Sequence, residues 1–359
     1  MSPFEPGKVF MPTTCYPADD LRQFMEELFG STGVSTSDAR LVADMFLEAN
    51  LRGVDSHGIR LIPAYITRLV HEGVNPTPKI KVVSDLGAAV RLDGDNCLGQ
   101  VAGYHAMNLA MKRAASHGIG FALVGRTSHT GAGSYYVRMP LERNMAGFAT
   151  SNNLPSLFVW GGLKRALSNP PVSISFPARK TPFILDICLG TVAWNKIYMK
   201  LNENRSIPQG WAWNADGIVT TDPKAASEGG SIIPIGGHKG SGITVAVDLF
   251  TGVLSGFHFA EQIGGLFTSD SDPEGCSCIM MALDVTRILG PEVLDRAEEL
   301  IRWLKESPLA REVEEIVMPG EPEQRMRKQR LKTGIPISDY DIQQLKETAR
   351  RQGVNSPFG

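Results

Sequence analysis

Val54-Asp55-Ser56-His57-Gly58-Ile59-Arg60 separates two segments in which apolar residues recur at helical spacing. The segment before it carries Leu41, Val42, Met45, Phe46 and Ala49, and the segment after it carries Ile59, Ile62, Tyr65, Ile66 and Leu69. Because Asp55 and Ser56 are frequent N-cap residues, the sequence predicts that a helix begins at this stretch and that Gly58 keeps its turn compact.

This position would set the chemistry of His57. At the start of a helix the imidazole lies beside free backbone N–H groups, and the helix dipole favours its neutral form because a cation there opposes the dipole. A neutral histidine with Arg60 about one turn away suits a base that acts on a carboxylate-bearing molecule. The same residues also fit an N-capped helix whose histidine only closes a turn.

Composition narrows the class of protein. The chain has 359 residues, enough for two domains, and 42% hydrophobic with 21% charged residues is ordinary for a soluble protein. With 36 basic and 38 acidic residues, no global field favours nucleic acid or an anionic membrane. The N-terminus lacks a hydrophobic signal core, and the longest apolar segment, 243–257, is too short to span a bilayer. We therefore expect a soluble, cytoplasmic protein without nucleic-acid or membrane partners.

The five cysteines indicate a reducing compartment. They are odd in number and scattered, which does not suit a disulfide framework: Cys15, Cys97, Cys188, Cys276 and Cys278. The apolar run after Cys278 predicts a strand over 279–284, so the close pair Cys276 and Cys278 is expected to pack there and not to bind zinc. We expect no metal site.

Residues 17–72 predict a small unit of three helices. The first carries the apolar stripe of Leu21, Phe24, Met25, Leu28 and Phe29, and the glycines at 30 and 33 end it. Thr36 or Ser37 caps the second, and the third runs from the His57 turn to Gly73. Helices are also predicted over 292–306 and 339–351. The basic run 325–332 between them is interpreted as a solvated helix face, because the total charge is nearly neutral.

A second candidate site follows a buried strand. Strands are predicted at 79–83 and 88–92 as a hairpin, followed by a helix at 99–116 and a strand at 121–124. That strand leads into a loop with Ser128, His129 and Thr130, just ahead of the next helix. Active-site groups are commonly placed at such strand-to-helix junctions. The alternative is a glycine-rich connection in which His129 is incidental.

Asp186 comes directly after a short apolar strand predicted at 183–185, which is one strand beyond that at 146–150. A carboxylate there must find a partner or face a cleft, because isolated burial is costly. His57 and His129 are the obvious partners, since orienting an imidazole is a recurring task for carboxylates. The alternative is a surface aspartate that caps the helix containing Ala193 and Ile197.

The segment Gly236-Gly237-His238-Lys239-Gly240-Ser241-Gly242 precedes an apolar helix predicted from Ile243 and follows a turn-rich, tryptophan-containing stretch at 206–222. Free N–H groups and a lysine at a helix start form an anion site, so phosphate binding is physically sensible. The segment is not a Walker A sequence, and the chain has no strand–GxGxxG–helix fingerprint. These residues indicate an anion site without identifying a dinucleotide.

Taken together, the motifs resemble a known family. Asp55-Ser-His57-Gly58-Ile-Arg60, Ser128-His129-Thr-Gly131, Asp186-Ile-Cys188, Gly237-His-Lys239-Gly240 and Pro319-Gly320-Glu321 occur in the order found in the malate/L-lactate dehydrogenase-like oxidoreductases. This family is distinct from the Rossmann-type lactate and malate dehydrogenases. It includes sulfolactate and ureidoglycolate dehydrogenases and reductases of diketogulonate and cyclic imino acids. The similarity covers nearly the whole chain.

The resemblance implies an α+β architecture. It implies a non-Rossmann NAD(P)-binding mixed α/β domain over 76–299 and an interleaved helical domain built from both chain ends, 1–75 completed by 300–359. It also implies a homodimer with sites near the interface. Two short segments, Ser206-Ile-Pro208 and Thr220-Thr-Asp-Pro223, look like the ureidoglycolate dehydrogenase branch.

The resemblance also implies roles for individual residues. His57 and His129 match the catalytic positions, with Asp186 and Ser56 beside them. Arg60 would hold the substrate carboxylate, helped by Ser56 and Thr130. The positions expected around the cofactor are His129, Asn153, Asp186, Ile187, Cys188, His238, Lys239, Gly240, Gly320 and Glu321.

The implied function is hydride transfer between nicotinamide and a small 2-hydroxy or 2-oxo acid. A base must take the hydroxyl proton, and histidine titrates near neutral pH. Arginine offers a planar fork for a carboxylate, and the cofactor supplies the hydride chemistry. We expect NAD, with NADP as the alternative, and malate or lactate as substrate. Ureidoglycolate dehydrogenase and cyclic imino acid reductase activities are alternatives. A metal-dependent hydrolase using His57, His129, His238 and Asp186, or a ligand-binding relative without turnover, stays open.

Overall fold

A seven-stranded mixed sheet forms the centre of the protein. The computed structural model describes residues 13–359. The strands lie in the order β2 (Lys81–Asp85), β3 (Ala89–Cys97), β4 (Ile119–Thr127), β13 (Cys276–Leu283), β5 (Ala146–Ser151), β8 (Pro171–Phe176) and β9 (Phe183–Cys188). Only β3 and β4 pair in parallel within this sheet, and the predicted hairpin joins β2 to β3. The mixed α/β architecture confirms the expected fold class.

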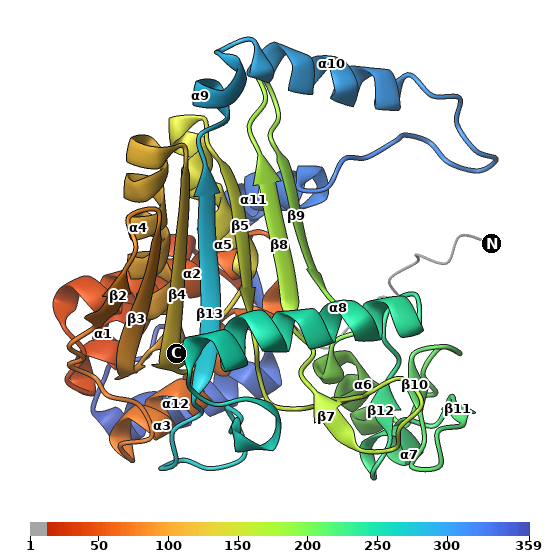
Figure 1. Ribbon diagram of the computed structural model, residues 1–359. Helices are drawn as coiled ribbons and strands as arrows, with labels where there is room; N and C mark the ends of the chain where they lie inside the picture. Colours follow the sequence, from red (N-terminus) through yellow and green to blue (C-terminus); the bar gives the residue numbers. More distant parts are fainter. Residues whose placement is uncertain (1–12) are drawn as a thin grey trace.

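Two helices cover one face of this sheet, α4 (Gly99–His117) and α5 (Gly133–Arg138). Alternate residues of β13 turn toward α4 and form one buried cluster with it: Cys278, Met280 and Ala282. Cys276 and Cys278 are free, buried thiols in β13, as the apolar run predicted. The opposite face carries α8 (His238–Asp248), which crosses the strands and continues as a π-helical turn, η4 (Leu249–Val253) (Figure 1).

A smaller sheet lies beyond the C-terminal end of β9 (Figure 1). It has the order β11 (Val219–Thr220), β10 (Ala212–Trp213), β12 (Ser231–Ile232), β6 (Leu157–Phe158) and β7 (Arg165–Leu167). The helices α6 (Trp194–Asn202) and α7 (Pro223–Ser227) belong to the same part, and their buried residues share one core with the short strands. This region includes the tryptophan-containing segment at 206–222, which packs through Trp211 as expected.

The helical part joins both ends of the described chain. It contains α1 (Ala18–Ser31), α2 (Thr36–Leu51), α3 (Ile62–Val70) and α12 (Asp339–Gln352), and β1 (Thr13–Tyr16) pairs with β14 (Ile335–Ser338). The ring of Phe358 lies 4.9 Å from that of Tyr16 and 5.3 Å from that of Phe24. Leu98 and Val101, which precede and begin α4, also belong to this core. The core therefore crosses the predicted domain limit at residue 75, and the division into 1–75 with 300–359 and 76–299 stays a prediction.

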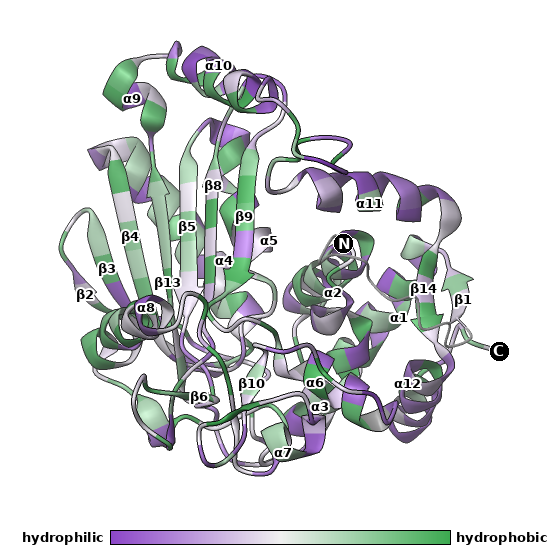
Figure 2. Cartoon of the chain, turned by 90° about the vertical axis from the view of Figure 1, so that its right-hand side faces the viewer, coloured by the Kyte–Doolittle hydropathy of each residue, from purple (hydrophilic) through white to green (hydrophobic). Residues whose placement is uncertain are grey.

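Three helices complete the chain: α9 (Val285–Leu289), α10 (Val293–Lys305) and α11 (Glu321–Thr333). Figure 2 shows α11 as strongly hydrophilic, and it packs against α2. Its basic residues are not merely solvated, because Arg327 pairs with Glu48 at 2.8 Å and Arg330 pairs with Asp55 at 2.6 Å. No helix within residues 13–359 is both long and apolar enough to cross a membrane.

Three predicted helix starts were wrong. Ser35, and not Thr36 or Ser37, caps α2, with its hydroxyl accepting the N–H of Asp38 at 3.2 Å. The stretch around His57 does not start a regular helix: it forms two 3-10 turns, η1 (Asp55–His57) and η2 (Ile59–Leu61), and α3 starts only at Ile62. The helix α8 starts at His238 instead of Ile243, because Gly236 and Gly237 take the left-handed conformations that turn the chain into it.

Gly58 separates the two 3-10 turns and has no room for a side chain. A Cβ atom there would lie 2.3 Å from Oδ1 of Asn50, and that oxygen accepts the N–H of Ile59 at 2.8 Å. Any larger residue would therefore displace Asn50 and free a buried N–H group.

We expect Gly58→Ala to lower the free energy of unfolding by roughly 1–3 kcal/mol, the usual cost of overpacking. Urea unfolding followed by circular dichroism measures this. Gly30→Ala is the matched control, because a Cβ at Gly30 in α1 meets nothing within 4 Å. It should be neutral or slightly stabilising. Equal stability of the two variants would contradict the packing role of Gly58.

Candidate active site

The two predicted histidines come together although they lie on separate elements. His57 ends the 3-10 turn η1, and His129 lies in the loop between β4 and α5. Their ring centroids are 5.5 Å apart and the planes differ by 24°. Both side chains are half-buried. This pair is the structural centre of the candidate site.

Residues from α2, which precedes the His57 turn, and from α11, near the C-terminus, hold this turn by hydrogen bonds. Asn50, near the end of α2, donates to Oδ1 of Asp55 at 2.7 Å while its own oxygen accepts from Ile59. From α11, Arg330 donates to both oxygens of Asp55, at 2.6 and 2.9 Å. Asp55 therefore serves as an anchor for the turn and not as the N-cap that the sequence suggested.

Two opposing effects act on the pKa of His57. Burial lowers it, and the negative charge of Asp186 raises it. The Oγ of Ser56 lies 3.0 Å from Nδ1 of His57, which places a hydroxyl on one ring nitrogen. The side chains of Ser56 and His57, which were predicted to lie together, are therefore in direct contact.

Asp186 lies inside β9, which runs on to Cys188, and not at the end of a strand as predicted. Its oxygens accept the backbone N–H of Ser134 and the hydroxyl of Ser173, both at 2.7 Å. These partners, and not an imidazole, make its hydrogen bonds. The predicted pairing of Asp186 with a histidine is therefore electrostatic only: the charge of Asp186 acts on His57 without a hydrogen bond between them.

Hydrogen bonds hold His129 at its ring and at its backbone. Oη of Tyr65 on α3 lies 2.6 Å from Nδ1 of His129, and the N–H of His129 donates to Glu274 at 3.1 Å. Burial, with a smaller contribution from His57, lowers the pKa of His129 to about 3. The ring is therefore neutral near pH 7.

A small cavity opens at His57. Its walls come from α2, α4 and the His129 loop: Met45, Phe46, His57, Gln100, Thr130, Gly131 and Ala132. The hydroxyl of Thr130, one of the predicted substrate contacts, donates to Ser151 at 3.2 Å. Arg60, the predicted carboxylate ligand, has its Nε 3.9 Å from Asp341 of α12. It would have to exchange this acid for a substrate carboxylate.

The predicted cofactor residues follow the edge strand β9. Gly320 packs against Ile184 near its start, where the N–H of Ile184 donates to Pro319 at 3.1 Å. Glu321 pairs with Lys305 at 2.5 Å. Asp186, Ile187 and Cys188 occupy the second half of the strand, and Ile187 is 40% exposed. Burial raises the pKa of the Cys188 thiol, which favours its neutral form.

Beyond β9, the chain leads to the start of α8. The N–H of Ile235 donates to the carbonyl of Leu189 at 2.8 Å, which brings the 236–240 segment next to the end of the strand. His238 lies 6.0 Å from the ring of Trp160, and a Cβ at Gly240 would meet the carbonyl of Ile235. Asn153 exchanges two hydrogen bonds of 3.0 Å with the backbone of Asn169.

These residues fit a dinucleotide physically. Lys239 and the positive end of the α8 dipole suit a diphosphate, and the 40% exposed Ile187 on β9 offers an apolar surface. A six-residue strand spans about 20 Å, which suits a long ligand lying beside it. Within residues 13–359, no three side chains of His, Cys, Asp or Glu are grouped to hold a metal ion.

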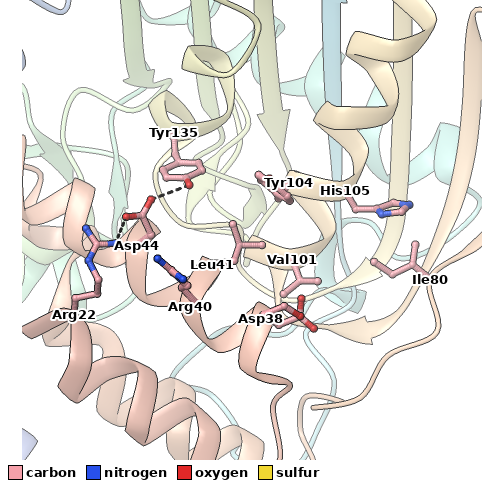
Figure 3. A pocket seen from close by; sticks show the side chains of 11 residues that line it. Arg22, Asp38, Arg40, Leu41, Asp44, Ile80, Val101, Tyr104, His105 and Tyr135 are labelled. Carbon is pink, nitrogen blue, oxygen red and sulfur yellow. Dashed lines mark hydrogen bonds and ion pairs between the residues drawn. The ribbon is translucent and has the colours of Figure 1, made fainter. Parts of the chain in front are cut away.

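A larger cavity lies elsewhere. It has a volume of about 590 Å³ and lies between the α1–α2 pair and the α4–α5 side of the sheet (Figure 3). Figure 3 shows Arg22 and Tyr135 directed at Asp44, which they bind by an ion pair and by a 3.0 Å hydrogen bond. None of the predicted site residues lines this cavity.

Sequence reasoning missed the residues that hold His129. The helical spacing of apolar residues places Tyr65 in a helix core, and its hydroxyl is the one local signal, because a buried tyrosine hydroxyl normally needs a partner. Gln100 and Glu274 carried no local pattern that could have connected them to His129. Their role depends on contacts between segments far apart in the chain.

The two imidazoles lie 5.5 Å apart, and the negative charge of Asp186 on the edge strand β9 acts on one of them. The sequence profile of the malate/L-lactate dehydrogenase family matches residues 16–346. The chain belongs to this family, as its motifs indicated. Membership of a dehydrogenase family implies a nicotinamide cofactor and a small hydroxy- or oxo-acid substrate.

Individual relatives agree with this assignment. The chain is 34% identical to malate dehydrogenase of Pyrococcus horikoshii over 359 residues, covering 98% of this chain and 99% of that one. It is 36% identical to L-sulfolactate dehydrogenase of Methanocaldococcus jannaschii, covering 90% and 93%. A reductase of pyrroline- and piperideine-2-carboxylate from Pseudomonas putida is 27% identical, covering 92% and 96%. The solved structure of malate dehydrogenase from Pyrococcus horikoshii is similar to this chain with a TM-score of 0.89 at 32% identity, covering 98% of this chain and 99% of that one.

We expect Asp186→Asn to lower the pKa of His57 further, because the substitution removes the negative charge that opposes the effect of burial. The amide keeps an oxygen for the N–H of Ser134, so the fold should be retained. An NMR titration of the His57 ring in wild type and variant measures the shift. An unchanged or raised pKa in the variant would show that Asp186 does not act on His57.

Proposed function

We propose that the protein transfers hydride between NAD and a small 2-hydroxy or 2-oxo acid, with malate and oxaloacetate as the first pair and lactate and pyruvate as the second. The observation that supports this most directly is the pair of half-buried imidazoles 5.5 Å apart, both with lowered pKa, in a member of this family. NADP is the alternative cofactor, since Lys239 could also meet an additional phosphate.

We assign the proton transfer to His57. When Nδ1–H of His57 donates to Ser56, its Nε2 lone pair is free to accept the proton of a substrate hydroxyl. The charge of Asp186 then stabilises the imidazolium that forms. His129, whose pKa is about 3, is a poor base near neutral pH and suits a hydrogen-bonding role. When bound, the nicotinamide supplies the hydride acceptor or donor.

Substrate and cofactor positions follow the predicted residues. Arg60 would bind the substrate carboxylate after leaving Asp341, with Ser56 and Thr130 near the same end of the site. The cofactor would lie along β9. The residues that would hold it are His129, Asn153, Asp186, Ile187, Cys188, His238, Lys239, Gly240, Gly320 and Glu321.

Two other substrate classes have specific support. The Pseudomonas putida relative is named for cyclic imino acids, whose C=N bond accepts hydride as a 2-oxo group does. The segments at 206–208 and 220–223 resemble ureidoglycolate dehydrogenase. Both substrate classes carry a carboxylate beside the reacting carbon, so the same site would serve them.

A substrate panel tests this proposal. Purified protein is mixed with NADH or NADPH and with oxaloacetate, pyruvate, other 2-oxo acids and cyclic imino acids, and loss of reduced-cofactor absorbance is followed. Oxidation with oxaloacetate supports the malate assignment, and oxidation only with an imino acid replaces it with the alternative. Failure of both cofactors to bind would contradict the proposal.

We expect His57→Ala to lower kcat by roughly 10²- to 10⁴-fold, the usual contribution of a positioned acid–base group. We expect His129→Ala to lower kcat by roughly 10²- to 10³-fold, the usual cost of removing one hydrogen-bond donor to a developing negative charge. The dissociation constant for NADH, measured by fluorescence titration, should change far less. His117→Ala is the control, because His117 is exposed at the end of α4. Unchanged turnover in both site variants would remove the two histidines from the mechanism.

We further propose that the protein is a homodimer. The segment formed by α8, η4 and the residue after η4 exposes five large apolar side chains, each between 49% and 59% accessible: Ile243, Leu249, Phe250, Val253 and Leu254. Several exposed large apolar side chains on one short segment favour a protein partner over solvent. A second copy of the chain is the partner that the family resemblance implies.

Phe250→Glu combined with Leu254→Glu should convert the dimer to a monomer of 39.0 kDa, because each glutamate would have to be buried unpaired at the interface. Sedimentation velocity measures the mass. Leu86→Glu, on the exposed β2–β3 turn, should leave the dimer intact. A monomeric wild-type protein at micromolar concentration would contradict this assembly.

A further inference from the structure

Two buried side chains, Tyr65 and Gln100, form a hydrogen-bonded chain that ends at the ring of His129. Oη of Tyr65 lies 2.6 Å from Nδ1 of His129 and 3.1 Å from its carbonyl oxygen. On the other side, the amide of Gln100 in α4 donates to the same Oη at 2.9 Å. Tyr65 is fully buried and Gln100 is 1% exposed, so water cannot substitute for either partner.

The positions of the hydrogens follow from these contacts. Tyr65 has one hydroxyl hydrogen, and Gln100 already donates to its oxygen. A separation of 2.6 Å suits an O–H donor, whereas N–H donors usually lie nearer 2.9 Å from an oxygen. The shorter contact therefore assigns the Tyr65 hydrogen to Nδ1 of His129, and the carbonyl at 3.1 Å is the weaker acceptor. A neutral imidazole that accepts at Nδ1 carries its hydrogen on Nε2.

The surroundings keep both groups in these protonation states. Burial lowers the pKa of His129 to about 3 and raises that of the Tyr65 phenol well above its usual range. Neither group changes its charge near neutral pH. The hydrogen-bond pattern, and not the pH of the solution, then decides which ring nitrogen of His129 carries the hydrogen.

We propose that Tyr65 and Gln100 are positioning residues that hold His129 as its Nε2–H tautomer, so that it donates a hydrogen bond to the 2-oxygen of the substrate. This inference rests on the function proposed above. In reduction, hydride from the reduced cofactor reaches C2 and the proton on His57 reaches the oxygen, while His129 keeps its own hydrogen. The Nε2–H of His129 stabilises the negative charge that develops on that oxygen.

The helix α3 also controls the backbone of His129. Arg68, three residues after Tyr65, places its Nε 3.4 Å from Oε1 of Glu274, and both side chains are at most 2% exposed. The other oxygen of Glu274 accepts the N–H of His129. One face of α3 thus fixes the ring through Tyr65 and the main chain through Arg68 and Glu274. Such double support leaves the imidazole little freedom to turn.

The tautomer can be read directly. In full-length protein labelled with ¹⁵N-histidine, the imidazole nitrogens of His129 are assigned by comparison with His129→Gln and recorded between pH 6 and 8. We expect a protonated Nε2 and an unprotonated Nδ1 throughout this range. A protonated Nδ1 would overturn the proposal. This readout needs no substrate, so it remains decisive even if no member of the substrate panel is reduced, a result that would count against the proposed function alone.

Tyr65→Phe removes the hydroxyl and keeps the ring, which packs 5.1 Å from Phe46. We expect both tautomers to appear at His129 and kcat to fall by roughly 100-fold, the scale of a misplaced catalytic group. The dissociation constant for NADH should be unchanged. Tyr104→Phe, on the exposed side of α4, is the matched control and should behave as wild type. Retention of both the Nε2–H tautomer and full kcat in Tyr65→Phe would show that the hydroxyl does not position His129.

Discussion

The hydrogen bond between Tyr65 and His129 joins the helical part of the chain to the central sheet at the site itself. The two histidines lie on different sides of this junction, so their 5.5 Å separation depends on how α3 packs against the loop after β4. The C-terminal segment adds a second constraint, because Arg330 of α11 holds Asp55 in the His57 turn. An interleaved chain, in which both ends complete one helical part, is thus a condition for the site and not only a feature of topology.

Burial determines the electrostatics of this junction. Arg68 and Glu274 are almost fully enclosed, and burial raises the pKa of Glu274 to about 7 despite the neighbouring arginine. A buried ion pair is seldom retained for stability alone, since its desolvation offsets much of the attraction. Here the pair connects α3 to the backbone of His129. The same enclosure keeps His129 neutral, while Asp186 on β9 acts on His57 alone, so the two imidazoles have different environments although their rings are close together.

Local patterns in the sequence predicted much of the architecture. The spacing of apolar residues located α1, α2, α4 and the strand with two cysteines. Turn residues located the β2–β3 hairpin, charge order located α12, and several ordered motifs indicated the family. The errors arise where distant residues override local preference. Asn50 takes the N–H of Ile59 and turns an expected helix start into 3-10 turns. Asp186 lies within β9 because Ser134 and Ser173 satisfy it there. Tyr65, Gln100 and Glu274 act on His129 only in the folded chain, so no sequence spacing connects them to it.

Direct hydride transfer is the central claim, and isotope transfer tests it most directly. Reduced cofactor carrying deuterium at both C4 positions of the nicotinamide ring is incubated with the protein and a 2-oxo acid that it reduces, and the product is analysed by mass spectrometry and proton NMR. The account predicts a 2-hydroxy acid with one deuterium bonded to C2 and none exchanged into water. A product with ordinary hydrogen at C2, or deuterium released to solvent, would contradict it.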